Sequence, residues 1–201
     1  MSRIEQKKAL KRERILEAAR ALFTSRGYDA ATTREVATLA GVAHGTVFRY
    51  APTKQDLLLM LYIDRLSAAL ERGLREAAPE SPLDEQLLTI FSTFLETYAD
   101  APALAARFIE AVRFASGQRG TEYARLNEAY IEAIVARVAL AQGRGEVRAE
   151  LPPAAVAEAA FAMYAVVVYT WVRCPEPVIE DAQTKLRALL EMLFNGVGAR
   201  T

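Results

Sequence analysis

Residues 32–54 read TTREVATLAGVAHGTVFRYAPTK, and this stretch decides the fold. It contains two short apolar-periodic segments, one opened by Thr32 or Thr33 and one spanning about His44–Tyr50, on either side of a turn at Gly41. Glycine ends a helix at little cost because it readily adopts the left-handed conformation. Two short helices joined by such a turn are typical of a helix-turn-helix, whose second helix enters the major groove of DNA.

The two short helices need a core between them. We expect four apolar side chains to point inward and set the angle between the helices: Val36, Leu39, Val47 and Phe48. The other positions of the second helix would face outward, and the major groove is wide enough to admit one helix. These outward positions are Ala43, His44, Gly45, Thr46 and Arg49.

The rest of the chain has helical periodicity. Apolar residues recur every three to four positions, no stretch alternates every two residues, and all eight prolines fall between the periodic segments. We therefore predict an all-α chain of about nine helices, with an N-terminal three-helix domain followed by a larger helical domain. Besides the two short helices, the expected ranges are 8–26, 54–76, 82–98, 103–115, 121–141, 153–173 and 176–195.

Charge is unevenly distributed along the chain. Residues 1–54 carry a net charge of +6 and residues 55–201 a net charge of −6, so the total is zero. Such asymmetry indicates that the first segment meets a polyanion. The basic residues before the helix-turn-helix either contact that polyanion or form a solvated tail, and the sequence leaves both readings open: Lys7, Lys8, Lys11, Arg12 and Arg14.

Residues from about 10 to 58 resemble the DNA-binding domain of the TetR (tetracycline repressor) family. The resemblance is carried by the Gly-Tyr pair after the first helix, the TTREVA opening, the AGV turn, the GTVFRY helix and the lysine that begins the next helix. The helical remainder is similar to the family's second domain in length and helix count only. The resemblance implies a TetR-type DNA-binding domain at 1–54 and a helical ligand-binding and dimerisation domain at 55–201.

The family likeness also implies roles for individual residues. Thr33 and Arg34 would open the helix that crosses the DNA backbone, and the helix start at Thr53 would meet a phosphate, where the helix dipole helps. Ala43, His44, Gly45 and Thr46 occupy positions that meet bases or nearby phosphates, and Tyr50 and Lys54 would hold phosphates. Arg49 is either a further phosphate contact or a surface charge.

Three positions depart from the family pattern. Phe48 stands where the family usually has tyrosine, so a phosphate-bonding phenol is missing. His44 replaces a common lysine, so the permanent positive charge of that lysine is missing at this position. Ala51 replaces a frequent phenylalanine, which would loosen the packing beside the second short helix.

The second domain is rich in aromatic side chains, which form either an ordinary core or the walls of an apolar ligand cavity. The resemblance favours an effector pocket, for which we expect the walls Phe94, Tyr98, Phe108, Tyr130, Tyr164 and Trp171 and the polar anchors Arg113 and Asn127. Residues 153–173 and 176–195 resemble the helices that form the family's homodimer interface; the alternative is that they pack within one chain. The expected partners are therefore double-stranded operator DNA, a second copy and a small-molecule effector.

Other classes of protein fit the composition poorly. With one histidine and one cysteine, Ser-His-Asp, Cys-His and histidine-rich metal sites are excluded, and no glycine-rich phosphate loop is present, so we expect neither an enzyme nor a cofactor or metal. A carboxylate pair stays open. The apolar stretch 154–172 contains Glu158 and lacks flanking basic clusters, which favours a buried helix of a cytoplasmic protein over a membrane span. A helical protein-interaction adaptor without effector control is the remaining alternative.

Overall fold

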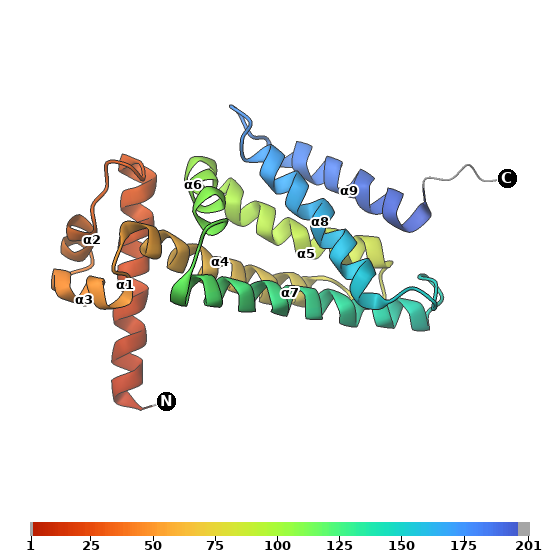
Figure 1. The fold of residues 1–201 in the computed structure, drawn as a ribbon, viewed down its shortest axis with the longest axis horizontal. Helices are drawn as coiled ribbons and strands as arrows, with labels where there is room; N and C mark the ends of the chain where they lie inside the picture. Colours follow the sequence, from red (N-terminus) through yellow and green to blue (C-terminus); the bar gives the residue numbers. More distant parts are fainter. Residues whose placement is uncertain (1, 197–201) are drawn as a thin grey trace. The chain divides into compact units, whose positions relative to one another are not determined.

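The computed structural model describes residues 2–196, and within that range it contains nine helices and no strand, as the periodicity predicts (Figure 1). The helices are α1 (Arg3–Arg26), α2 (Thr33–Leu39), α3 (His44–Tyr50), α4 (Lys54–Glu76), α5 (Leu83–Ala99), α6 (Pro102–Val112), α7 (Gly117–Gly143), α8 (Pro153–Trp171) and α9 (Ile179–Asn195). The range expected for α3 is reproduced, and Gly27 ends α1 with a φ of 83°.

The largest shift in a helix boundary lies at the start of α1, five residues before the predicted position. Ser2 Oγ accepts a hydrogen bond from the Glu5 amide at 3.2 Å, and the Glu5 carboxylate accepts one from the Ser2 amide at 2.6 Å. This reciprocal capping box satisfies two amides that have no partner inside the helix. The basic residues around Lys8 therefore lie on a helix and not on a tail.

The helices divide into two compact units. The first contains the chain up to Arg65 together with Ala103–Tyr123, and the second contains Leu66–Pro102 and the chain from Ala124 onward. The first unit thus recruits α6 and the beginning of α7 from far along the sequence. The boundary predicted between residues 54 and 55 separates a DNA-binding domain from a ligand-binding domain. It divides the chain by function and not by compactness, and it stays a prediction.

The core of the first unit corrects one expectation about the helix-turn-helix. Val36 and Val47 are fully buried as predicted, but Leu39 and Phe48 are each 57% exposed. A seven-residue helix buries one narrow stripe, and small residues one turn away take the inward places: Ala37, Ala40 and Ala51. Farther along this unit, Tyr62 of α4 stacks on Phe108 of α6 with ring centroids 4.6 Å apart.

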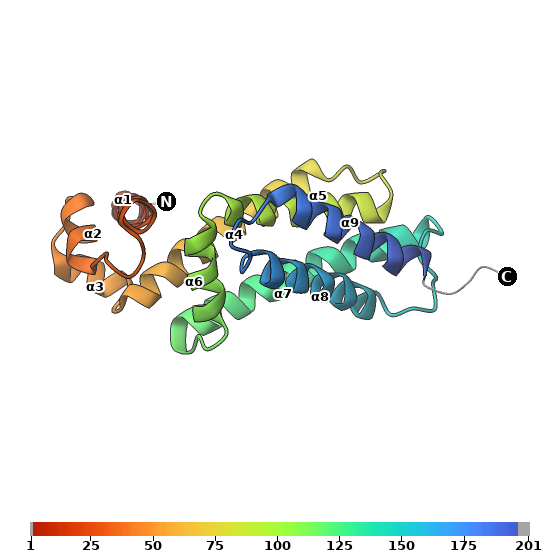
Figure 2. The ribbon, with the colours of Figure 1, turned by 90° about the horizontal axis from the view of Figure 1, so that it is seen from above.

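The second unit is held by close packing among its helices. In Figures 1 and 2, α5 lies beside α9, and α8 packs on α9 and α5. Gly73 of α4 lets α5 approach, because a Cβ there would lie 2.9 Å from the Ile90 Cα. Arg137 of α7 donates to the carbonyls of Leu74 and Ala77 at 3.0 and 3.1 Å, which caps the last turn of α4.

Helix α8 meets the length and composition of a membrane span, with 39% of its most apolar window buried. A core helix of a soluble protein passes the same test, and the buried face of α8 includes Tyr164, Val167 and Trp171.

Candidate nucleic-acid interface

The start of α2 is held by its own side chains. Thr32 Oγ1 accepts from the Glu35 amide at 3.2 Å, and the Glu35 carboxylate accepts from the Thr32 amide at 2.9 Å. The Thr32 hydroxyl also donates to the Glu35 carboxylate, at 2.8 Å. The hydroxyl and amide hydrogen bonds from Thr32, followed by the charge of Arg26, lower the pKa of the Glu35 carboxyl below its ordinary value. The capping box fixes where α2 begins, and with it the positions of Thr33 and Arg34.

The turn between α2 and α3 requires glycine. Gly41 has a φ of 62°, and a Cβ there would lie 2.6 Å from the Arg14 guanidinium. Arg14 Nη2 reaches across from α1 and donates to the Ala40 carbonyl at 2.5 Å. Arg14, one of the basic residues for which a polyanion contact was open, therefore fastens α1 to the end of α2.

The predicted groove-facing side of α3 is open to solvent. Ala43, His44, Gly45 and Arg49 are exposed, and Thr46 is half-buried. His44 Nε2 lies 3.1 Å from Thr33 Oγ1, which brings the beginnings of α3 and α2 together. Phe48 adds an exposed aromatic ring to the same helix. Because its side chains are exposed, this face of α3 is available to a partner.

Two predicted phosphate-binding side chains also have structural partners. The Tyr50 hydroxyl donates to the Lys8 carbonyl of α1 at 3.1 Å. Lys54 Nζ donates to the carbonyls of Tyr28 and Asp29 at 2.8 and 2.9 Å and lies 4.6 Å from the centre of the Tyr28 ring. An ammonium has three donors, so these two hydrogen bonds leave one donor of Lys54 for a further acceptor.

The beginning of α4 carries a third capping arrangement. Thr53 Oγ1 accepts from the Asp56 amide at 3.0 Å, and the Asp56 carboxylate accepts from the Thr53 amide at 3.1 Å. Thr53 and Lys54 therefore stand at a well-formed helix N-terminus, where the dipole favours an anion.

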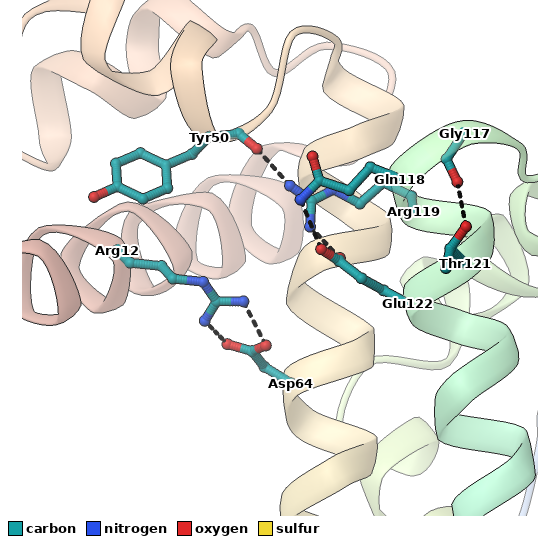
Figure 3. Close-up of polar contacts among 8 residues, drawn as sticks. All are labelled: Arg12, Tyr50, Asp64, Gly117, Gln118, Arg119, Thr121 and Glu122. Atoms are coloured by element: carbon teal, nitrogen blue, oxygen red, sulfur yellow. Dashed lines mark hydrogen bonds and ion pairs between the residues drawn. The ribbon is translucent and has the colours of Figure 1, made fainter.

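Sequence reasoning missed the contact that holds the end of α3. Arg119, in the first turn of α7, is buried; it donates to the Tyr50 carbonyl at 2.5 Å and pairs with Glu122 (Figure 3). Arg12 of α1 forms a two-pronged ion pair with Asp64 of α4, which raises the pKa of the Arg12 guanidinium. A positive charge at the carboxyl end of a helix is favourable because the last carbonyls lack partners within the helix.

The residues expected to form the effector pocket fall into both units. Phe94 meets Tyr130 edge-on at 4.5 Å and Tyr164 at 5.8 Å, so these three form one aromatic cluster in the second unit. Trp171 is buried near the end of α8, where its indole N–H donates to the Val178 carbonyl at 2.8 Å. Tyr98 is buried and Asn127 half-buried in that unit, whereas Phe108 and the exposed Arg113 belong to the first unit.

No group of three or more histidine, cysteine or acidic residues within the described range is placed to hold a metal ion.

Comparison with known proteins identifies the helix-turn-helix. Residues 15–61 match the family model described as "Bacterial regulatory proteins, tetR family". The transcriptional repressor KstR of Rhodococcus jostii is 33% identical over 112 residues, which cover 56% of this chain and 52% of that protein, so the alignment spans about half of each. The fatty acid metabolism regulator protein of Bacillus subtilis is 22% identical over 183 residues, or 91% of this chain and 93% of that protein.

Solved structures share the fold over almost the whole chain. FadR of Thermus thermophilus, a TetR-family repressor solved with lauroyl-CoA, has a TM-score of 0.75 at 24% identity and covers 94% of this chain and 96% of its own. FadR of Bacillus subtilis, solved with stearoyl-CoA, also has a TM-score of 0.75, at 22% identity over 92% of this chain and 99% of its own. These relatives are named as regulators or repressors, and the segment of this chain that holds the helix-turn-helix, residues 15–61, is similar to the TetR family of bacterial regulatory proteins.

Proposed function

We propose that the chain is a cytoplasmic repressor that binds a palindromic operator as a homodimer and is released by a small, largely apolar effector. The observation that carries the proposal is the exposed face of α3, set at a fixed angle to α2 by the buried pair Val36 and Val47. The α3 helix would enter the major groove, and two-fold symmetry would place its copy about 34–36 Å away, in the next groove.

The DNA contacts we assign follow the exposed positions and the helix starts. Ala43, His44, Gly45 and Thr46 would face base edges, because they begin the helix that enters the groove. The remaining contacts would go to phosphates and position the protein without reading sequence. They are Thr33, Arg34, Arg49, Tyr50, Thr53 and Lys54.

The dimer interface we propose consists of residues 153–173 and 176–195. An apolar stripe of α8 is exposed in the single chain: Ala162, Val166 and Tyr169 follow at helical spacing. On α9, Ala188 and Met192 are exposed one turn apart. Small and apolar side chains at such positions let two helix pairs pack closely against their copies.

The effector site we propose centres on the aromatic cluster of Phe94, Tyr130 and Tyr164. The Phe91 ring stacks on the Tyr164 ring with centroids 4.7 Å apart, and the Phe161 ring lies 5.9 Å from that of Tyr164, so five rings pack together in one region of the second unit. Aromatic walls with few polar groups suit an apolar chain. The acyl-CoA ligands of the two FadR structures make a long-chain acyl thioester the first effector class to test.

The decisive experiment measures binding of the purified protein to fluorescent fragments of the DNA that flanks its gene, with and without acyl-CoA thioesters of increasing chain length. We expect two or four chains to bind a palindromic site and long-chain thioesters to release them. Binding that no thioester changes would contradict the effector class. If the protein bound no DNA even at low salt, the adaptor alternative would replace the regulator.

A further inference from the structure

A groove between α1 and α3 begins at the assigned contacts of α3 and extends beyond them to α1. It has a volume of about 750 Å³ and is lined mainly by one face of each helix, with Met60 of α4 and Gln118, Arg119 and Glu122 of α7 completing the lining. The α1 wall consists of Ile4, Lys7, Lys8 and Lys11, whose spacing places them on one stripe of the helix. The α3 wall includes Thr46 and Arg49. We call this the α1–α3 groove.

The two walls are held at a fixed distance from each other. The Tyr50 hydroxyl of α3 donates to the Lys8 carbonyl of α1, and Arg119 holds the Tyr50 carbonyl from α7 (Figure 3). The capping box at Ser2 keeps α1 helical as far as its first residues. The lysines of the α1 wall therefore stand on a rigid element that is bonded to the helix proposed to enter the major groove.

The charge along the groove is positive and largely uncompensated. Arg12 is neutralised by Asp64, and Arg119 by Glu122. Lys7, Lys8, Lys11 and Arg49 are exposed, and among the described residues none of the four has an acidic partner within ion-pair distance. Four exposed cations on a rigid surface are suited to a partner whose negative charges run along a line.

We propose that the α1–α3 groove holds the sugar-phosphate backbone of DNA, with Lys7, Lys8 and Lys11 on phosphates that flank those contacted through Arg49. This inference rests on the proposed function and extends it to residues before the family match, which begins at residue 15. A small anion is less suited to the groove, because such ligands are held by convergent, mostly buried polar groups, whereas these ammonium groups are solvated.

The arrangement has a consequence for specificity. Contacts to phosphates carry no base information, so the groove strengthens binding to every sequence by the same factor. It also orients the duplex relative to α3, because Thr46 and Arg49 belong to both the groove and the face that enters the DNA.

The test compares two variants of the full chain. The groove variant carries Lys7→Ala, Lys8→Ala and Lys11→Ala; alanine has the highest helix propensity, so α1 stays helical. The control variant removes three exposed positive charges elsewhere: Arg75→Ala, Arg125→Ala and Arg148→Ala. Both carry the same net charge, and circular dichroism and thermal unfolding confirm that both fold. Affinity for a random 30-bp duplex and for the operator fragment is measured across a salt series.

We expect the groove variant to lose about 2.7 units of the slope of log K against log salt, since three phosphate contacts contribute about 0.9 each. Its affinity should fall by the same factor for operator and random DNA, while the control keeps the wild-type slope. Equal slopes in the two variants would overturn the groove proposal and leave the proposed function standing. A wild-type protein that binds neither DNA would instead remove the proposed function.

A second measurement addresses the small-anion alternative. Inorganic pyrophosphate is titrated into the protein at constant ionic strength and followed by calorimetry. We expect no saturable binding. Saturable binding that the groove variant loses and the control variant keeps would assign the groove to a small anion and overturn the proposal.

Discussion

The guanidinium of Arg119 donates a 2.5 Å hydrogen bond to the main-chain carbonyl of Tyr50, the last residue of α3, across 69 positions of sequence. The same guanidinium pairs with Glu122 one turn later on α7. The end of the helix proposed to read DNA is therefore held by a side chain from outside the helix-turn-helix. Helix α7 continues from there to Gly143 and carries Tyr130, one of the residues proposed to line the effector site.

Substitution Arg119→Ala should weaken operator binding more than binding to random DNA. A hydrogen bond to a charged group contributes about 1.5–3 kcal/mol, so operator affinity should fall roughly ten- to a hundredfold if α3 loses its orientation. Arg119→Lys restores the charge and should recover part of the loss. The measurement is the ratio of operator to random affinity, with Glu122→Gln as the control that keeps the Arg119–Tyr50 bond. An unchanged ratio would show that Arg119 only stabilises the fold.

Substitution Lys54→Ala should lower affinity for all DNA sequences alike and reduce the salt slope by about one unit, because it removes one of the proposed phosphate contacts. It also removes the hydrogen bonds to Tyr28 and Asp29. Arg107→Ala is the matched control, because it breaks the ion pair with Asp29 on the same loop. If Lys54→Ala and Arg107→Ala both kept the wild-type slope of log K against log salt, Lys54 would only hold the loop at Tyr28 and Asp29 and would not contact a phosphate.

Substitution Phe48→Tyr should strengthen DNA binding two- to tenfold, since a new hydrogen bond contributes about 0.5–1.5 kcal/mol. The ring is 57% exposed, so the added hydroxyl can reach a phosphate without a buried polar group being left unsatisfied. The salt slope should stay the same, because a phenol adds no charge. Leu39→Met, at an equally exposed position of α2, controls for general surface effects; a gain of the same size there would refute the phosphate contact.

At acidic pH, the contribution of the Glu35 capping box at the start of α2 to the free energy of unfolding should decrease. The pKa of Glu35 is lowered in the folded chain, chiefly by the hydrogen bonds from Thr32, so its contribution is present above about pH 4.3, the ordinary pKa of glutamate, and is lost as the pH falls through the folded value. In Glu35→Gln the amide does not titrate. The stability difference between wild type and this variant should therefore be constant above pH 5.5 and shrink below about pH 4. Denaturant unfolding across this range checks it, and parallel curves would contradict it.

Substitution Val166→Glu should convert the proposed dimer into monomers, because it places a charge in the apolar stripe of α8. Leu140→Glu is the matched control: Leu140 is 56% exposed and Val166 is 55% exposed, but Leu140 lies on α7, outside the proposed interface. Light scattering gives the mass of each variant. A dimer that survives Val166→Glu but not Leu140→Glu would move the interface to another face.

Helix content and most boundaries could be predicted from periodicity, prolines and caps, because these signals are local. The start of α1 was not predicted, although Ser2 and Glu5 carry the capping-box spacing, because residues 3–14 are mostly charged and such a stretch is also typical of a solvated tail. The burial of Leu39 and Phe48 was wrong because a periodic pattern does not say how wide a stripe a short helix buries.

Some parts of the candidate site could likewise be predicted from the sequence, and others could not. The exposed face of α3 follows from the motif, so its members could be named in advance. The Arg119–Tyr50 contact could not, because its acceptor is a main-chain carbonyl that carries no residue-specific signal. The effector residues were chosen as aromatics on several helices, and only the fold shows that Phe94, Tyr130 and Tyr164 meet while Phe108 stacks elsewhere.

The first compact unit is discontinuous in sequence, and this limits how the protein can be recombined. Residues up to Arg65 depend on 103–123 for the ring beneath Tyr62, for the partner of Asp29 and for the cation that caps α3. A chimera that joins only the first 65 residues to another regulator would expose the fully buried Tyr62 and release the end of α3. A functional exchange of DNA specificity therefore has to carry two separate pieces of the chain or replace only the exposed residues of α3.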